Sequence, residues 1–261
     1  MSRIESFFQS AKRKALIAYV TAGYPDVETT LEVVPALVEA GCDMVELGIP
    51  FSDPLADGTT IQRASHRALQ GGITPRKCIG IAGELRKRVD VPLIFMGYYN
   101  PMLHYGLDGF CDASAKAGVD GLIVPDLPPE EGAELEKVAV DKGIDLIYLL
   151  APTTTDEGRL RLVAERSRGF IYVVSLKGVT GARTDLPPEL EGFISRVKGV
   201  TDKPLCVGFG ISTPEQAKQV SALSDGVIMG SRILDVIDGS ERPAAAVGEF
   251  IRQVRAAIDT D

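Results

Sequence analysis

The sequence predicts an α/β fold: a (β/α)8 TIM barrel with an extra N-terminal helix, formed by residues 1–261 as a single domain. Eight short apolar runs alternate with longer amphipathic segments, and strict alternation of this kind implies parallel strands joined by helices. A chain of 261 residues also has the usual size of a closed barrel. An open doubly wound sheet is the alternative architecture for the same units.

Each predicted strand ends in small or polar residues, as strands do where functional loops follow. The strands are 15–21, 44–48, 92–97, 121–125, 145–150, 170–175, 205–208 and 226–229. The predicted helices are 27–40, 59–70, 74–89, 107–117, 130–142, 156–166, 188–198, 213–221 and 244–258. Residues 2–14 have apolar side chains at helical spacing, so we expect a short helix that plugs the N-terminal face of the barrel.

Three connections from helix to strand repeat the order Gly, one residue, Asp. They are Gly41 to Asp43, Gly118 to Asp120 and Gly143 to Asp145. Glycine just after a helix is a typical C-cap in the left-handed region. We interpret the repetition as architectural, at the end of the barrel opposite to the functional loops.

The composition excludes several classes of function. The net charge is -8 with no long basic run, so no nucleic-acid or anionic-membrane surface is indicated. A signal-peptide core and a membrane-spanning apolar stretch are missing from the sequence, so we expect a soluble, cytoplasmic protein. Four scattered cysteines without a C-x-x-C pair predict reduced core thiols, and two histidines are too few for a metal cluster. Small molecules or other proteins are the favoured partners.

Residues 46–58, which read ELGIPFSDPLADG, hold three carboxylates directly after an apolar strand. Glu46 stands between Val45 and Leu47, so its side chain points opposite to theirs, into the interior. Burial there raises the pKa of a carboxyl and lets it carry protons near neutral pH. A buried Glu paired with Lys or Arg for structure is the alternative.

Asp57 ends this segment and has a structural alternative of its own as the N-cap of the helix predicted at 59–70. Pro50 and Pro54 favour the chemical interpretation, because they stiffen the loop that holds the acids. Positioned acid–base pairs require such stiffness.

Two glycine loops follow the seventh and eighth strands, where barrels commonly bind phosphate. The first contains Gly208 and Gly210, and the second contains Gly230 and Ser231 at the start of a short helix. Helix N-termini attract phosphate through unpaired N–H groups. Tight turns are the alternative, and no nucleotide-binding P-loop or G-x-G-x-x-G motif is present.

The stretch after the sixth strand, 175–185, has the composition of a glycine-hinged lid, although it could equally be an ordinary exposed loop. Lys177 within it offers a rival chemistry, a Schiff base with a carbonyl substrate. A lysine on an exposed glycine-flanked loop is poorly placed for the desolvation that such chemistry needs.

Taken together, these motifs resemble the tryptophan synthase alpha subunit over nearly the whole chain. The resemblance rests on 46–58, on Gly178-Val179-Thr180-Gly181, on Gly208-Phe209-Gly210-Ile211 and on Gly230-Ser231, in the family's order and spacing. It implies a lyase of L-tryptophan biosynthesis that splits indole-3-glycerol phosphate into indole and glyceraldehyde 3-phosphate by a retro-aldol reaction. It also implies that this subunit uses no metal or organic cofactor.

The resemblance further implies roles for individual residues. Glu46 would carry both protons, and Asp57, kept ionised, would accept the indole N–H and stabilise positive charge on the ring. Asp53 would face the partner and couple the two sites. Thr180 would close the lid onto Asp57. The remaining assignments are substrate contacts at Tyr19, Ile61 and Tyr172 and phosphate contacts at Gly181, Gly210, Gly230 and Ser231.

The implied partner is the beta subunit, a pyridoxal-phosphate enzyme that receives indole within an alpha2-beta2 heterotetramer. Two apolar segments predicted as exposed loops, Pro54-Leu55 and Pro101-Met102-Leu103, are the contact surfaces we expect.

The sequence departs from the family pattern at three places, and three other functions remain as alternatives. Thr59 stands where many members have Pro, Leu176-Lys177 replaces an Arg-Ala pair, and the sequence does not decide between Tyr98 and Tyr99 as the tyrosine facing substrate. A Schiff-base aldolase using Lys177, an inactive barrel that activates a partner, and a glycosidase using two carboxylates are the alternatives.

Overall fold

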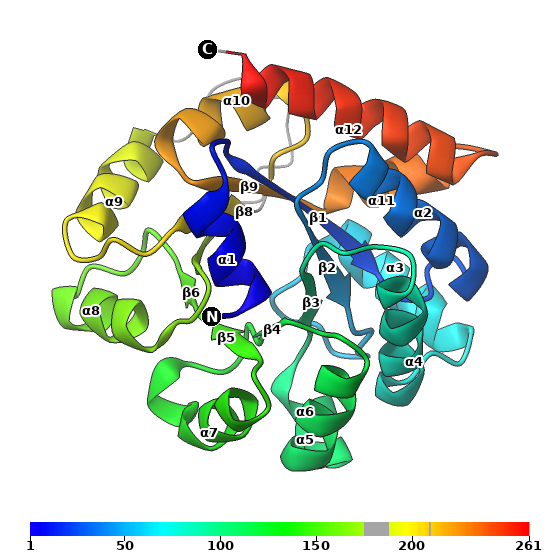
Figure 1. Ribbon diagram of the computed structural model, residues 1–261, viewed down its shortest axis with the longest axis horizontal. Helices are drawn as coiled ribbons and strands as arrows, with labels where there is room; N and C mark the ends of the chain where they lie inside the picture. The colour runs from blue at the N-terminus through cyan, green and yellow to red at the C-terminus, as the bar shows by residue number, and fades with distance from the viewer. Residues whose placement is uncertain (175–187, 209, 261) are drawn as a thin grey trace.

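The computed structural model describes residues 1–174, 188–208 and 210–260, and its helices surround a central ring of strands (Figure 1). In chain order the elements are α1(Arg3–Ser10), β1(Ala15–Thr21), α2(Val27–Glu39), β2(Met44–Gly48), α3(Thr59–Gln70), α4(Pro75–Arg86), β3(Leu93–Met96), α5(Tyr99–Tyr105), α6(Leu107–Lys116), β4(Gly121–Ile123), the 3-10 helix η1(Pro129–Glu131), α7(Ala133–Asp141), β5(Asp145–Ile147), β6(Leu149–Leu150), α8(Glu157–Arg166), β7(Ile171–Val174), α9(Pro188–Lys198), β8(Leu205–Gly208), α10(Pro214–Leu223), β9(Gly226–Met229), α11(Ser231–Asp238) and α12(Pro243–Asp259).

The strands of the described ranges pair in parallel in the order β5-β4-β3-β2-β1-β9-β8-β7-β6. The two ends of this order, β5 and β6, are separated in the chain only by Tyr148, whose carbonyl accepts a hydrogen bond from the N–H of Tyr172 at 3.0 Å. Residues 145–150 therefore complete the ring as one interrupted strand position. The predicted TIM barrel is confirmed, and the open-sheet alternative is wrong.

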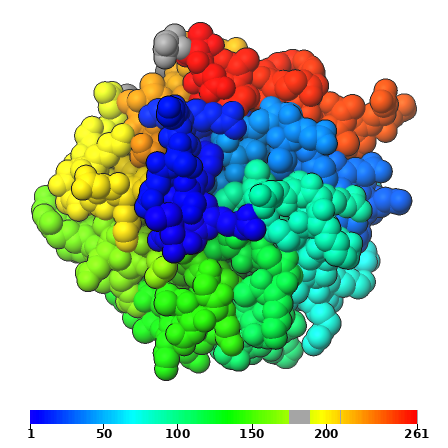
Figure 2. All heavy atoms as spheres, in the orientation of Figure 1, coloured from blue at the N-terminus to red at the C-terminus, as the bar shows by residue number. Residues whose placement is uncertain are grey.

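Helix α1 lies across the centre of one face of the barrel, as the sequence predicts (Figures 1 and 2). Its Ile4 is fully buried and packs where β4 begins at Gly121 and beside Gly169, just before β7. A capping box formed by Ser2 and Glu5 starts the helix, and the Ser2 hydroxyl also donates to Asp145 at the start of β5. This face is therefore the N-terminal one, and the loops of chemical interest lie at the opposite face.

The predicted helices are present with shifted bounds, and α5 is a helix that the sequence did not predict. The sequence predicts an exposed loop at 101–103, whereas Pro101 lies in the first turn of α5, where a missing N–H costs nothing. The expected exposed segment Pro101-Met102-Leu103 is accordingly part of a helix. Met102 is buried there, and only Leu103 is half exposed. The prediction of an exposed loop at 101–103 is therefore wrong, and a partner contact at these residues stays a prediction.

The Gly and Asp repeat has the architectural role inferred for it. Gly41, Gly118 and Gly143 all have positive φ after a helix. Two aspartates of the repeat bond to the neighbouring strand: Asp43 accepts the N–H of Leu16 and Asp120 that of Leu93, each at 2.9 Å. Asp225, which precedes β9 outside the repeat, accepts the N–H of Leu205 at the same distance. A carboxylate that precedes one strand therefore fixes the beginning of the strand beside it.

The four cysteines are free and buried, as predicted for reduced core thiols. Among the described residues, no helix is long and apolar enough to cross a membrane.

Candidate active site

Glu46 is fully buried in β2, at the register position opposite Tyr19 of β1. Neither of its carboxyl oxygens has a hydrogen-bond partner within the described ranges. Burial raises the pKa of this carboxyl to about 8, and no interaction opposes the shift. The structural alternative, a Glu paired with Lys or Arg, is therefore wrong for the part of the chain that the structure describes, and Glu46 is protonated at neutral pH.

Two buried phenols share the interior with Glu46 because glycines on adjacent strands leave room for them. A Cβ added at Gly48 would lie 2.1 Å from the Tyr19 hydroxyl, and one at Gly208 would lie 2.2 Å from the Tyr172 hydroxyl. Both phenols therefore lean toward the C-terminal ends of β2 and β8. Burial, and then the charge of Glu46, raise the pKa of Tyr172 well above its ordinary value, so its phenol stays neutral.

Asp57 lies on the acidic loop, residues 49–58, one position before the residue that caps α3. That cap is Gly58, which makes no side-chain hydrogen bond, so the capping alternative for Asp57 is wrong. Burial raises the pKa of the Asp57 carboxyl to about 6, and a hydrogen bond with Tyr98 opposes the shift. Asp57 is therefore ionised at neutral pH while Glu46 keeps its proton, so the two acids have opposite roles available to them.

Tyr98 is the tyrosine that faces the acidic loop, a point that the sequence leaves open. Its hydroxyl accepts the Ala56 N–H at 2.9 Å, and its ring centre is 5.3 Å from that of Phe51. Tyr99 instead begins α5, and its N–H donates to Asp126. Their position after the third strand places both tyrosines at the face where functional residues collect, and it does not decide between them.

Asp53 does not join Glu46 and Asp57. Its side chain is exposed, and it accepts a hydrogen bond from the Ser52 hydroxyl. Leu55, on the same loop, is 94% exposed, whereas Pro54 is partly buried. The tip of the acidic loop is thus an exposed surface, and its base, at Asp57, faces the site.

Of the two glycine loops, the one after β9 lies against Tyr19. Gly230 caps α11 without a side-chain hydrogen bond, and a Cβ there would lie 3.2 Å from the Cβ of Tyr19. Ser231, the first residue of α11, is exposed, so the first N–H groups of that helix have no side-chain cap. Gly210 has φ +79, a left-handed conformation that favours glycine. Ile61 is buried in the first turn of α3.

Three residues assigned by resemblance or alternative lie outside the described residues. They are Lys177, Thr180 and Gly181, together with the rest of the expected lid at 175–185.

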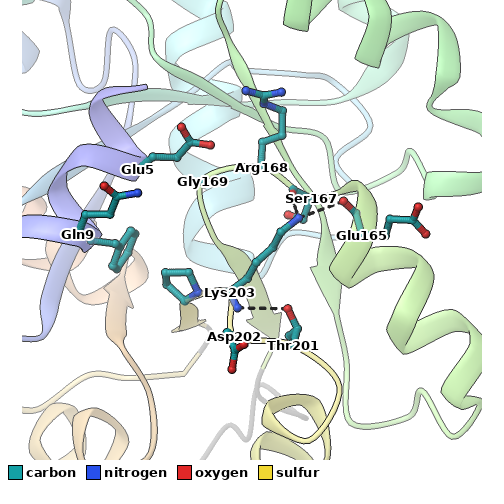
Figure 3. Close-up of a pocket in the computed structure, with 11 residues that line it drawn as sticks. Glu5, Gln9, Glu165, Ser167, Arg168, Gly169, Thr201, Asp202 and Lys203 are labelled. Carbon is teal, nitrogen blue, oxygen red and sulfur yellow. Dashed lines mark hydrogen bonds between the residues drawn. The ribbon is translucent and has the colours of Figure 1, made fainter. Parts of the chain in front are cut away.

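A cavity of about 640 Å³ lies at the N-terminal face, between α1, the turn before β7 and the segment before β8 (Figure 3). Its lysine, Lys203, donates to the carbonyl oxygens of Glu165 and Ser167. Arg168, also in the lining, donates to Asp145 at 3.2 Å. These cations hold loops together, at the face where barrels carry stabilising residues.

Comparison with known proteins gives one family. The family model described as "Tryptophan synthase alpha chain" matches residues 6–259. The tryptophan synthase alpha chain of Dehalococcoides mccartyi is 56% identical over 259 residues, which are 99% of this chain and 100% of that one. The alpha chain of Geobacter sulfurreducens is 47% identical, covering 99% of both chains.

Solved structures agree with this. The crystal structure of tryptophan synthase subunit alpha from Legionella pneumophila has a TM-score of 0.92 and 39% identity, covering 99% of each chain. A crystal structure of tryptophan synthase from M. tuberculosis in an aminoacrylate-bound form includes a chain with a TM-score of 0.89 and 34% identity, covering 99% of this chain and 100% of that one.

A full-length family match, close relatives and a shared fold therefore support the resemblance drawn from the motifs. Members of this family work without a cofactor of their own, pyridoxal phosphate lying in the beta subunit that is their partner. The chain belongs to the tryptophan synthase alpha chain family, the carbon–carbon lyases that cleave indole-3-glycerol phosphate in tryptophan biosynthesis.

Proposed function

We propose that Glu46 is the proton carrier of the retro-aldol cleavage. A protonated carboxyl gives its proton to the indole ring carbon that bears the side chain, and the carboxylate then removes the proton from the hydroxyl of the adjacent side-chain carbon. The carbon–carbon bond breaks, indole leaves, and the hydroxyl carbon becomes the aldehyde of glyceraldehyde 3-phosphate. Glu46 ends the cycle protonated, as it began. The observation that carries this proposal is a fully buried carboxyl with no hydrogen-bond partner in the described ranges and a pKa of about 8.

Asp57 is proposed to stay ionised and to accept the indole N–H. Protonation of the ring places positive charge on the indole nitrogen, so a fixed carboxylate stabilises that charge as it develops. Tyr98 holds the loop at Asp57 through the Ala56 N–H. The raised pKa of Asp57, about 6, remains low enough for this role at neutral pH.

The substrate phosphate is proposed to bind at the N-terminus of α11. Ser231 and Gly230 present uncapped N–H groups there, and Gly210 provides exposed backbone in the neighbouring loop. Gly181 completes the phosphate site by family resemblance, and Thr180 closes the lid loop onto Asp57. The indole ring is proposed to lie against Tyr19, Ile61 and Tyr172, three largely buried side chains.

The assembly proposed for the chain is an alpha2-beta2 complex in the cytoplasm, with residues 1–261 acting as a single domain. Asp53 and Leu55, at the exposed tip of the acidic loop, are proposed to contact the beta subunit and to couple the two active sites. A loop with its tip at the partner and its base at Asp57 offers a short path between them.

The test is indole release from indole-3-glycerol phosphate by the full-length chain with a beta subunit. Glu46→Gln is expected to lower turnover at least 100-fold, the usual contribution of general acid–base catalysis. Because Glu46 must hold a proton and Asp57 must not, kcat/KM of the wild type is expected to fall below pH 6 and above pH 8.

The matched control is Glu134→Gln, which changes an exposed acid on α7. It is expected to leave turnover and the pH profile unchanged. Turnover by Glu46→Gln within tenfold of the wild type, with a normal unfolding transition, would refute the assignment of the proton carrier.

A further inference from the structure

Charged side chains join α3 to α11 across the surface of the barrel. The guanidinium of Arg63 on α3 lies 2.9 Å from Asp238 and 3.4 Å from Asp235, both on α11. We name these three residues the α3–α11 bridge. The Tyr24 hydroxyl, from the loop after β1, also donates to Asp238.

The two joined helices begin at the two halves of the proposed site. Helix α3 begins directly after the Asp57-Gly58 pair, and α11 begins directly after Gly230. The helices also pack against each other and against β1. The bridge therefore connects the helix that follows the proposed indole-binding acid to the helix that presents N–H groups to the substrate phosphate.

The acidic C-terminal end of α11 is stabilised by a positive charge that belongs to α3. Asp238 is the last residue of α11, and no basic residue occupies its last turn. Carboxylates at this end of a helix face the negative end of the macrodipole, which is unfavourable. Arg63 supplies the missing positive charge from another helix, so the orientation of α11 and that of α3 are linked.

We propose that the α3–α11 bridge is a positioning device that uses phosphate binding at α11 to hold Asp57 in place for cleavage. The inference rests on the proposed function for the phosphate site and for Asp57. A bound phosphate fixes the N-terminus of α11, and Arg63 transmits that restraint to the first turn of α3 and so to the end of the acidic loop. Binding energy from a group remote from the broken bond is thereby used to orient a reacting one.

The experiment separates the phosphate group from the reacting part of the substrate. The full-length chain, with a beta subunit, cleaves indole-3-glycerol lacking the phosphate, and phosphite dianion is added to occupy the phosphate site. The measured quantity is the acceleration by saturating phosphite. The variants are Arg63→Gln, Asp238→Asn, the double variant, and Arg63→Lys, which keeps the charge.

The matched control is Arg252→Gln on α12, which breaks an ion pair of the same length with Glu249, 2.9 Å apart, that lies within one helix and joins no two elements. The expected result is a wild-type acceleration that falls about fivefold in Arg63→Gln and in Asp238→Asn, the lower end of typical coupling between sites. The double variant is expected to lose no more than either single variant. Arg63→Lys is expected to restore part of the effect, and the control to match the wild type.

An undiminished saturated acceleration in Arg63→Gln and Asp238→Asn would overturn the inference. If phosphite affinity and thermal stability fall in both variants at the same time, the bridge is purely structural. Calorimetry of glycerol 3-phosphate binding to the wild type separates the inference about the bridge from the proposed phosphate site. Binding without any phosphite acceleration refutes the bridge alone, and absent binding refutes the proposed phosphate site itself.

Discussion

The two ends of the barrel treat buried acids in opposite ways. At the N-terminal face, Asp120 accepts the Leu93 N–H at 2.9 Å and pairs with Arg86 at 2.8 Å. Near the C-terminal face, Glu46 is more deeply buried and has no such partner among the described residues. Burial raises the pKa of both carboxyls, but at Asp120 the N–H and the guanidinium oppose the shift. Asp120 is paired, whereas Glu46, the proposed proton carrier, is not.

This difference has an energetic meaning. An unpaired carboxyl avoids the cost of a buried charge by holding its proton, which is what general acid catalysis requires of it. A salt bridge to Glu46 would stabilise the fold near neutral pH and would remove the proton. We infer that the site gives up stability at one residue in exchange for a group that titrates near neutral pH.

The largest effect of a substitution on stability is expected at the N-terminal face, which we call the paired end because its acids have basic partners. Asp43 is buried, lies 2.5 Å from Arg13 and 3.1 Å from the buried Arg255, and accepts the Leu16 N–H. Asp43→Asn leaves Arg255 with Asp259 as its remaining acid. Because the substitution breaks the buried ion pair with Arg255 and the pair with Arg13 together, the free energy of unfolding is expected to fall by about 4 kcal/mol, measured by urea denaturation. Turnover per folded molecule is expected to stay unchanged, and a stability equal to that of the wild type would contradict the account.

Substitution of Glu46 is expected to raise the free energy of unfolding, whereas substitution of Asp43 lowers it. In the unfolded chain this carboxyl has the ordinary pKa of 4.5, and in the fold its pKa is about 8. Below pH 4.5 both states are protonated; as the pH rises from 4.5 to 8 only the unfolded state loses its proton, so wild-type stability falls over that window. Glu46→Gln removes this loss. The variant is expected to exceed the wild type by about 3 kcal/mol at pH 7 and by little at pH 4.

Urea denaturation of both proteins from pH 4 to pH 9 measures this difference. The gap is expected to grow with pH and to level off above pH 8. A gap that is constant with pH would mean that folding does not shift the pKa of Glu46, which would contradict the account.

Much of this comparison could be predicted from the sequence. The eight strands follow from continuous apolar runs, since strands covered on both faces leave no polar alternation. The burial of Glu46 follows from its place between Val45 and Leu47. The paired end was recognised from the repeat of Gly and Asp before strands, although the bonds of Asp43 and Asp120 to neighbouring strands depend on register, which one sequence does not display.

Other features depend on tertiary contacts. Tyr98 and Tyr99 are adjacent and alike in sequence, and only the start of α5 decides which one turns to the acidic loop. The capping alternative for Asp57 failed because a helix can begin one residue later, at Gly58, without a side-chain cap. The contact of Gly48 with Tyr19 joins residues of two strands. None of these leaves a local pattern.

The contact between Gly48 and Tyr19 predicts the next largest effect on stability. Gly48→Ala places a Cβ 2.1 Å from the Tyr19 hydroxyl, so the phenol must move away from its place beside Glu46. The free energy of unfolding is expected to fall by about 2 kcal/mol, and kcat/KM is expected to fall with it. Gly80→Ala in α4 is the matched control, because no atom lies within 4 Å of its added Cβ. A helical alanine there is expected to stabilise slightly.

The smallest effect on stability is expected for an exposed ion pair at the paired end. It tests whether an acid at this face stabilises the fold only when it is buried. Asp90 lies 2.6 Å from Arg3, on the same face as Asp43 and Asp120, yet its side chain is 92% exposed. Water screens such a pair and competes for both partners. Asp90→Asn is expected to shift the thermal midpoint by less than about 1 °C at physiological salt, measured by circular dichroism. A shift as large as that of Asp43→Asn would mean that any acid at this face stabilises the barrel, and that pairing alone, without burial, distinguishes its two ends.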